Sequence, residues 1–289
     1  MFSVVIPAYR ADLTIRRAIL SARECGATEI IVVEDGSVGA TREIVADLGA
    51  RYEWQENRGA YWARLTGAKL CTMEFLVFLD ADDEMVPGGV IRNLEKLRRD
   101  HNISVAAGTV IGVDANGGEH QFPVRYRPVD TESLLRVGFG PWPPGAAMIR
   151  RSALEDANEV SPDPIETRYA DDYQLLIRLS RTGTIAVSDA AACRYSLAGG
   201  KSARSAFAAI SAKEAIRAHY AGAWNIPVEL MSSRAIRSAS DARRARANWA
   251  EHRWARAALL MARSAMLDLP RVARSARRRT VFRLKNWRA

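Results

Sequence analysis

Cysteine, long apolar runs and an N-terminal basic stretch are scarce or missing in this sequence, and each absence excludes a class of protein. Only three cysteines occur in 289 residues, Cys25, Cys71 and Cys193, and none has a CxxC spacing. A disulfide framework and a cysteine-rich zinc site are therefore excluded, and we expect each cysteine to be a small buried hydrophobe. No run of about 18 apolar residues is present, which excludes a membrane-spanning helix. The chain reaches Pro7 too early for a signal peptide, so we expect a cytoplasmic protein.

The charges are unevenly distributed along the chain. The whole sequence has 42 Lys and Arg against 33 Asp and Glu, a net charge of +9. Residues 201–289 hold 20 of the basic residues and only five of the acidic ones, so the first 200 residues are net acidic. Hydrophobic residues make up 48% of the chain, which is enough for a sizeable core and excludes a disordered protein. The sequence therefore predicts an acidic folded body followed by a basic region.

The first hundred residues alternate apolar runs with helical patterns. Apolar runs cover residues 2–6, 30–33 and 75–79, and helical spacing follows each run, beginning at Asp12 as an N-cap in the first case. This alternation is typical of βαβ units, in which helices cover both faces of a parallel sheet. Because ligands bind at the carboxyl ends of such strands, we expect the residues that follow the three runs to meet at one edge. These residues are Pro7-Ala8-Tyr9, Glu34-Asp35-Gly36-Ser37 and Asp80-Ala81-Asp82-Asp83.

The third of these groups is an acidic cluster. Asp80, Asp82 and Asp83 have only Ala81 among them, and they could be solvated turn residues that cap the next helix. The alternative is a Mg²⁺ or Mn²⁺ site, because oxygen ligands at the end of a rigid strand suit these ions and leave positions open for phosphate oxygens. An EF-hand is excluded, because Met85 stands where that loop requires glycine.

Four segments resemble, in the right order, the successive signatures of family 2 glycosyltransferases. They are Ser3-Val-Val-Ile-Pro-Ala-Tyr9, Ile30-Ile-Val-Val-Glu-Asp-Gly-Ser37, Asn57-Arg-Gly-Ala-Tyr-Trp-Ala-Arg64-Leu-Thr-Gly67 and Phe78-Leu-Asp-Ala-Asp-Asp83. The resemblance covers about residues 2–200 and implies an inverting enzyme of the GT-A fold, which is an α/β fold with a Rossmann-like, mostly parallel sheet flanked by helices. The domains expected are a catalytic domain over 1–205, with a nucleotide-binding half (1–100) and an acceptor half (101–205), and a helical basic extension over 206–289.

The resemblance also implies where a nucleotide-diphosphate sugar would bind. Asp35 would accept a hydrogen bond from the base, and Arg64 would help to hold the nucleotide. Asp80 and Asp82 match the Asp-x-Asp motif that holds ribose and a Mn²⁺ or Mg²⁺ ion, with Asp82 as the direct metal ligand and Asp83 assisting. The donor-binding residues implied are Pro7, Ala8, Tyr9, Glu34 (where the family usually has Asp), Asp35, Arg64 and Asp80.

A later segment, Tyr169-Ala-Asp-Asp-Tyr-Gln-Leu-Leu-Ile-Arg-Leu179, resembles the Glu-Asp motif of the family, whose second acid is the catalytic base. Asp172 occupies that place, and Asp171 stands where Glu is usual. Such a base takes the proton of the acceptor hydroxyl as its oxygen attacks the anomeric carbon opposite the phosphate. A helix N-terminus would favour the ionised carboxylate. On spacing alone, the two aspartates could equally be an N-cap pair.

One family signature is incomplete. Members often carry Tyr-Arg-x-His after the last strand, whereas residues 194–198 here read Arg-Tyr-Ser-Leu-Ala. Our hypothesis is that Lys201 or Arg204 supplies the positive charge to the diphosphate instead. A nucleotide-sugar-binding protein without catalysis, and a metal-dependent nucleotidyltransferase or phosphatase, are the alternatives.

The acceptor side and the basic region leave several interpretations open. Trp142, in the Gly- and Pro-rich loop 138–145, would either stack on a sugar or apolar carrier or anchor the loop in the core. Apolar residues from Ala250 to Ala265 are predicted on one helical face that ends before Pro270. That face would pack on the catalytic domain, attach the protein to anionic lipid on the inner face of the membrane, or form a homodimer contact. No nucleic-acid motif accompanies the charge.

Taken together, these features predict a metal-dependent, hexosyltransferase-like enzyme. Its donor would be a nucleotide-diphosphate sugar, UDP-linked in our interpretation. Its acceptor would be a saccharide or a lipid-linked saccharide, in the synthesis of a cell-surface polysaccharide or glycolipid.

Overall fold

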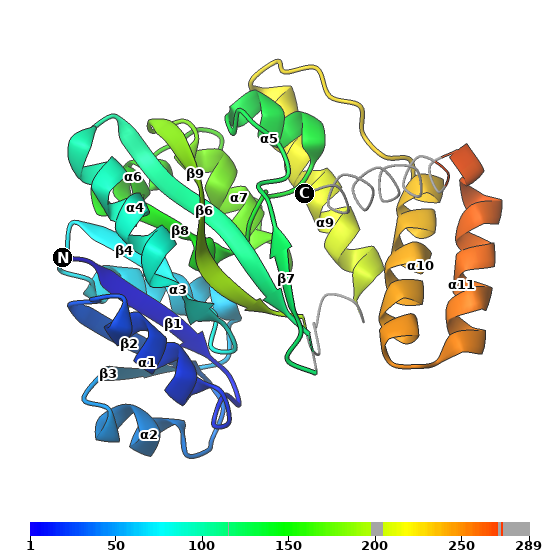
Figure 1. The fold of residues 1–289 in the computed structure, drawn as a ribbon. Coiled ribbons are helices and arrows are strands. Elements are labelled where there is room, and N and C mark those ends of the chain that lie inside the picture. Colours follow the sequence, from blue (N-terminus) through cyan, green and yellow to red (C-terminus); the bar gives the residue numbers. More distant parts are fainter. Residues whose placement is uncertain (115, 198–204, 271–272, 274–289) are drawn as a thin grey trace. The chain divides into compact units, whose positions relative to one another are not determined.

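The computed structural model describes residues 1–114, 116–197, 205–270 and 273, which divide into two compact units (Figure 1). The first unit comprises Met1–Glu166 and Asp171–Ala198, and the second comprises Thr167–Ala170 and Gly199–Ala289. Two residues of the sequence-based hypothesis, Lys201 and Arg204, lie outside the described residues.

Within the described part of the first unit, a nine-stranded sheet carries the fold. The strands are β1 (Ser3–Ala8), β2 (Glu29–Asp35), β3 (Arg51–Gln55), β4 (Phe75–Phe78), β5 (Glu84–Met85), β6 (Ile103–Val113), β7 (Glu119–Phe122), β8 (Ala147–Arg150) and β9 (Thr184–Ser196). Their order is β3-β2-β1-β4-β8-β6-β9-β5, with β7 on β6. The first four strands are parallel, and so are β6 and β9, while β8 runs antiparallel to both of its neighbours. The predicted α/β fold with a mostly parallel sheet is confirmed.

Strand β1 extends further than the sequence predicts. The apolar run was expected to stop at Pro7, but the strand continues to Ala8, and Pro7 pairs with Val33 of β2. On the other side of β1, the pairing with β4 ends when Val5 accepts a hydrogen bond from Leu79. Alternate residues of a strand point their backbone groups to the same side, so Pro7 faces this unpaired side, where its missing N–H breaks no ladder bond.

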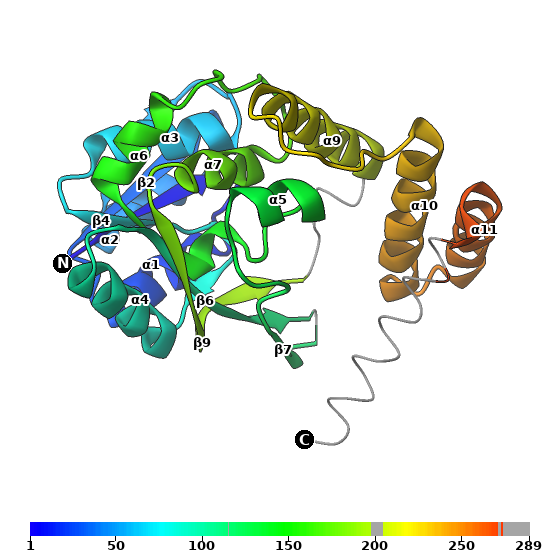
Figure 2. The same cartoon turned by 90° about the horizontal axis from the view of Figure 1, so that it is seen from above.

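Helices cover both faces of the sheet (Figure 2). One face is covered by α1 (Ile15–Glu24), α2 (Thr41–Asp47) and α4 (Pro87–Arg99), and the other by α3 (Ala60–Leu70), α6 (Arg151–Asn158) and α7 (Asp171–Leu179). A further helix, α5 (Thr131–Val137), and a 3₁₀ turn at Pro144–Ala146 complete the elements of this unit in the described residues. Asp12 was predicted as the N-cap of the first helix, which is wrong. That helix begins at Ile15, and Asp12 instead accepts a hydrogen bond from the Thr41 hydroxyl at 2.7 Å.

Helix α4 approaches strand β9 so closely that only glycine fits at the contact. A Cβ atom at Gly89 would lie 2.3 Å from the carbonyl oxygen of Ala191, whereas a Cβ atom at Gly88 meets nothing within 4 Å. We expect Gly89→Ala to lower the free energy of unfolding by about 1–3 kcal/mol, because backbone must move to admit the methyl group. Gly88→Ala, the matched control on the same helix, should be neutral or raise it by about 0.5 kcal/mol. Urea denaturation measures both variants, and equal midpoints would contradict this packing.

The second unit is helical in its described residues. It contains α9 (Ala206–Ala223), α10 (Ser233–Ala250) and α11 (Trp254–Leu267). Helices α10 and α11 form an antiparallel hairpin in which Ser238 and Ser264 each donate a hydroxyl hydrogen bond to the carbonyl oxygen of the other, at 2.9 and 2.8 Å. The prediction of one apolar helical face from Ala250 to Ala265 is wrong, because the chain turns between the two helices, where His252 has a positive φ of 58°.

The structure also bears on the helices that could span a membrane and on the three cysteines. No helix among the described residues is long and apolar enough to cross a membrane. The three cysteines are unpaired and buried, as predicted. Burial raises the pKa of Cys25 to about 12, so its thiol is held in the neutral, unreactive form.

Candidate active site

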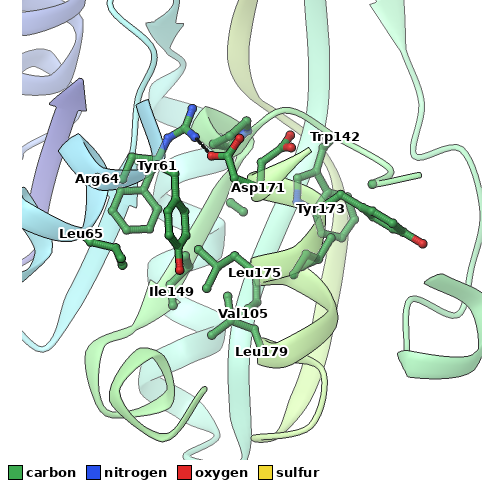
Figure 3. Close-up of a pocket in the computed structure, with 16 residues that line it drawn as sticks. Tyr61, Arg64, Leu65, Val105, Trp142, Ile149, Asp171, Tyr173, Leu175 and Leu179 are labelled. Atoms are coloured by element: carbon green, nitrogen blue, oxygen red, sulfur yellow. Dashed lines mark hydrogen bonds and ion pairs between the residues drawn. The ribbon is translucent and has the colours of Figure 1, made fainter. Parts of the chain in front are cut away.

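A buried arginine joins three segments that lie far apart in the sequence. Arg64, in the middle of α3, donates from Nη1 to Asp171 Oδ2 at 2.7 Å and from Nη2 to Asp80 Oδ1 at 2.7 Å. Figure 3 shows the bond between Arg64 and Asp171, the first residue of α7. Asp80 follows the end of β4. The planar guanidinium fork suits this double contact, because it presents two donors in fixed directions.

This cluster has strong electrostatic coupling. The side chain of Arg64 is only 9% exposed, and the charges of Asp80 and Asp171 hold the pKa of its guanidinium well above the usual value despite burial. Burial raises the pKa of Asp171, and the Asp172 charge adds to this rise, while Arg64 opposes it. Arg64 Nε is buried without a hydrogen-bond partner among the described residues. Arg64 therefore holds the cluster together, because its guanidinium donates a hydrogen bond to both carboxylates.

The acidic turn after β4 does not cap the helix that follows it. Helix α4 begins at Pro87, and its N-cap residue, Val86, makes no side-chain cap hydrogen bond. Asp82 is exposed, whereas Asp83 is buried and accepts a hydrogen bond from the backbone of Ser196 at 2.9 Å. Its Oδ2 has no partner in the described structure. Burial raises the pKa of Asp83 to about 8, and the neighbouring charges of Asp80 and Asp82 add to the rise.

The residues at this turn fit a divalent cation of the Mg²⁺ or Mn²⁺ type. Asp80 and Asp82 supply carboxylate oxygens, which these ions prefer. No group of three or more His, Cys, Asp or Glu side chains that could hold a metal ion is found in the described residues. A two-carboxylate site nevertheless suits Mg²⁺, which commonly uses one or two carboxylates and completes its coordination with water and substrate phosphates. The three neighbouring carboxylates repel one another, and a bound cation would relieve that repulsion.

The residues predicted to bind the base of the nucleotide lie at the ends of β1 and β2. Ala8 is buried at the end of β1, whereas Tyr9 is 37% exposed and the guanidinium of Arg10 lies 5.3 Å from its ring centroid. Glu34 accepts a hydrogen bond from Ser37 Oγ, which itself accepts one from the backbone of Arg10 at 2.7 Å. These contacts connect the ends of the two strands, as the parallel arrangement predicts.

Asp35 has a contact that sequence reasoning missed. Its carboxylate accepts hydrogen bonds from Gln55 Nε2 at 2.8 Å and from the backbone of Arg58 and Gly59 at 2.9 and 2.8 Å. Asp35 therefore anchors the loop from which α3 begins, and it helps to position Arg64. Gln55 itself accepts a hydrogen bond from Thr66 on α3 at 2.7 Å. Gln55 lies on β3, whose polar sequence Arg-Tyr-Glu-Trp-Gln offers no apolar run by which to detect it.

An apolar cavity of about 50 Å³ lies beside the two aspartates of α7 (Figure 3). Asp171 and Asp172 line it together with Tyr61, Leu65 and Trp142. The remaining lining residues are Arg64, Phe78, Val105, Gly140, Pro144, Ala147, Ile149, Tyr173, Leu175, Leu176 and Leu179. Trp142 is 9% exposed, so it anchors its loop and also presents part of its surface to the cavity. A carboxylate at an apolar cavity can accept a proton from a bound hydroxyl. Tyr61 lines the cavity although the sequence analysis gave it no role.

The sequence is similar to those of known glycosyltransferases. The family model described as "Glycosyl transferase family 2" matches residues 3–157. Chondroitin synthase of Escherichia coli is 25% identical over 194 residues, which cover 63% of this chain and 27% of that protein. The amylovoran biosynthesis glycosyltransferase AmsB of Erwinia amylovora is 28% identical over 202 residues, covering 63% and 64%. This chain thus spans only about a quarter of the chondroitin synthase.

Solved structures give the same fold. TarS 1-349 of S. aureus in complex with UDP-GlcNAc superposes with a TM-score of 0.58 at 19% identity, covering 84% of this chain and 72% of that one. The complex of TarS 1-349 with UDP has a TM-score of 0.56 at 17% identity, covering 90% of both chains. The predicted GT-A fold is confirmed. The family match covers more than half of the sequence and includes β1, β2, α3 and β4 together with both residues of the Arg64–Asp80 pair. The chain therefore belongs to glycosyl transferase family 2.

Proposed function

We propose that this protein is an inverting glycosyltransferase that moves a sugar from a UDP-linked donor to an acceptor hydroxyl. The observation that carries the proposal is the double contact of Arg64, which brings Asp80 of the Asp-x-Asp motif and Asp171 of the Glu-Asp-like motif to one place. The residues that hold the donor and the catalytic base must lie close together in this way if the acceptor hydroxyl is to attack the donor sugar. The UDP and UDP-GlcNAc complexes of TarS, which has the same fold, support a UDP-linked donor.

In the proposed reaction, the acceptor oxygen attacks the anomeric carbon on the face opposite the diphosphate. The carbon–oxygen bond to the diphosphate breaks, UDP leaves with the electron pair, and the Asp172 carboxylate takes the proton of the acceptor hydroxyl. Attack from the opposite face inverts the anomeric configuration. Asp80 and Asp82 would hold a Mn²⁺ or Mg²⁺ ion, which neutralises charge on the departing diphosphate when it is bound. Arg64 keeps Asp80 and Asp171 in position and leaves the adjacent Asp172 exposed at the cavity.

The acceptor is proposed to be a saccharide, free or lipid-linked. Tyr61 and Trp142 line the cavity beside Asp172, and aromatic rings of this kind pack against the apolar face of a sugar. The names of chondroitin synthase and of the amylovoran enzyme both refer to polysaccharides, which supports a role in polysaccharide or glycolipid synthesis. For the diphosphate, Lys201 and Arg204 stay the candidate cations in place of the missing histidine.

Asp82→Ala tests the metal part of the proposal. We expect UDP binding in the presence of Mn²⁺ to weaken by about tenfold or more. Even the mutation of a residue that only hydrogen-bonds a metal ligand lowers metal affinity by about that factor. Asp82 is exposed, so the fold should be unaffected. Isothermal titration calorimetry with UDP measures the effect, and Asp47→Ala, an exposed aspartate on α2, is the matched control. With a chelator present, all three proteins should bind UDP equally. Unchanged binding by Asp82→Ala in Mn²⁺ would contradict this metal assignment.

A further inference from the structure

Helix α11 is apolar on nearly every side, although α10 covers only one of them in the described contacts. Its 14 residues, Trp-Ala-Arg-Ala-Ala-Leu-Leu-Met-Ala-Arg-Ser-Ala-Met-Leu, contain two arginines and no acidic residue. Ala257, Leu260 and Ser264 are buried, and these residues form the side that faces α10. A helix that is apolar all round is normally buried on all sides. The rest of α11 therefore forms an exposed apolar surface, which is typical of a binding surface.

Large side chains are exposed on this surface. Leu259 is 71% exposed and Met266 is 74% exposed, and at helical spacing these two lie on the side of α11 opposite its buried residues. At the start of the helix, Trp254 is 47% exposed and packs edge-on against Trp249 of α10, which is 61% exposed, with ring centroids 4.4 Å apart. We call these four residues the hairpin surface.

The charge around the hairpin surface has one sign. Residues 233–267 contain eight arginines and two acidic residues, Asp241 and Glu251. Both acids are already paired within the hairpin, Asp241 with Arg263 at 3.1 Å and Glu251 with Arg253. Arg256 stands three residues before Leu259, so the two are neighbours on the helix. The partner must therefore accept exposed leucine, methionine and tryptophan and also carry negative charge.

We propose that the hairpin surface binds an anionic lipid bilayer, with Leu259 and Met266 entering the boundary between headgroups and acyl chains. Tryptophan is favoured at that depth because its ring is apolar and its N–H is polar. Each arginine beside the surface gains about 1 kcal/mol from anionic headgroups. A second copy of the chain fits less well, since pairing two hairpins would bring arginines of both copies together. Nucleic acid would satisfy the arginines but leave the leucine and methionine side chains in water.

Vesicle co-sedimentation of the full chain tests this proposal. Vesicles of phosphatidylcholine with phosphatidylglycerol should bind the protein at least tenfold more tightly than vesicles of phosphatidylcholine alone. Leu259→Glu should weaken binding to the anionic vesicles by tenfold or more, because it removes an apolar side chain that the bilayer would bury and adds a charge that the anionic headgroups repel. Arg256→Gln should weaken it about fivefold, the equivalent of about 1 kcal/mol. Ile91→Glu, at an exposed apolar site on α4 in the first unit, is the matched control and should bind like wild type.

Circular dichroism establishes first that each variant is folded, which Leu259 and Arg256 should permit because both are exposed. The proposal is overturned by equal binding to both vesicle types, by no binding to either, or by Leu259→Glu binding as wild type does. Retention of duplex DNA without preference for anionic vesicles assigns the charge to nucleic acid instead. A dimer in sedimentation velocity that Leu259→Glu dissociates assigns the face to a second copy. None of these readouts depends on sugar transfer, so this proposal and the proposed catalysis fail or hold separately.

Discussion

Asp172→Asn is expected to lower the rate of sugar transfer by a factor of about 10²–10⁴, the usual contribution of a general base. The amide cannot take the proton of the acceptor hydroxyl, so the attacking oxygen keeps it through the bond-forming step. Asp172 is exposed and hydrogen-bonds none of the predicted donor residues in the described contacts. UDP affinity should therefore change by less than about twofold. Single-turnover transfer assays measure the rate, and calorimetry with UDP measures binding.

The control for this variant is Asp156→Asn, which removes an exposed carboxylate from α6 and should leave both quantities unchanged. Transfer by Asp172→Asn at the wild-type rate would contradict the base assignment. Equal losses of transfer and of UDP binding would instead give Asp172 a role in holding the donor.

Arg64→Met should lower the free energy of unfolding by about 3 kcal/mol, the typical cost of removing one partner from a buried ion pair. The variant keeps the apolar bulk of the side chain but leaves Asp80 and Asp171 without the guanidinium that both now contact at 2.7 Å. Transfer should fall as well, because Asp171 at the start of α7 loses its ion pair with Arg64 of α3. Arg64→Lys keeps the charge, but a single ammonium group cannot reproduce the fork, so we expect an intermediate loss.

The loss in Arg64→Met should depend on pH in a defined direction. Burial raises the pKa of Asp171, and Arg64 opposes that rise, so removal of Arg64 raises this pKa further. The ionised carboxylate then destabilises the variant above its folded-state pKa, and protonation relieves the penalty below it. The difference in unfolding free energy from wild type should therefore be largest at alkaline pH and shrink as the pH falls.

Urea denaturation at a series of pH values measures this difference. Arg99→Met is the control, because Arg99 is 80% exposed, pairs only loosely with Glu95 at 4.0 Å, and should contribute less than about 0.5 kcal/mol at any pH. A loss in Arg64→Met that is small, or that grows on acidification, would show that the two aspartates do not need the guanidinium.

Sequence patterns predicted the elements that carry apolar residues and missed those that do not. The runs ending near Pro7, Val33 and Leu79 became β1, β2 and β4, because strands covered on both faces must be apolar throughout. Strand β3 was not predicted, since it lies at the sheet edge and its side chains are polar or half-buried. The turn at His252 was also missed, because alanine and arginine favour helix on both sides of it.

The candidate site was predicted more completely as a set of residues than as a geometry. Motif order indicated Arg64, Asp80 and Asp171, but nothing in the spacing showed that one guanidinium contacts both carboxylates across more than a hundred residues. The anchoring of Asp35 to the start of α3 was likewise out of reach, because two of its three donors are backbone N–H groups, which no residue pattern reveals. The roles of these residues in binding and catalysis stay predictions.

The release of UDP from nucleotide sugars is the most direct test of the central claim. The purified protein would be incubated with Mn²⁺ and a panel of nucleotide sugars, and free nucleoside diphosphate would be measured for wild type and Asp172→Asn. We predict release from at least one UDP-sugar by wild type, dependent on the identity of the sugar and reduced by about 10²-fold or more in the variant. Release from no nucleotide sugar, release of nucleoside monophosphate or inorganic phosphate instead, or equal release by the variant would contradict the account.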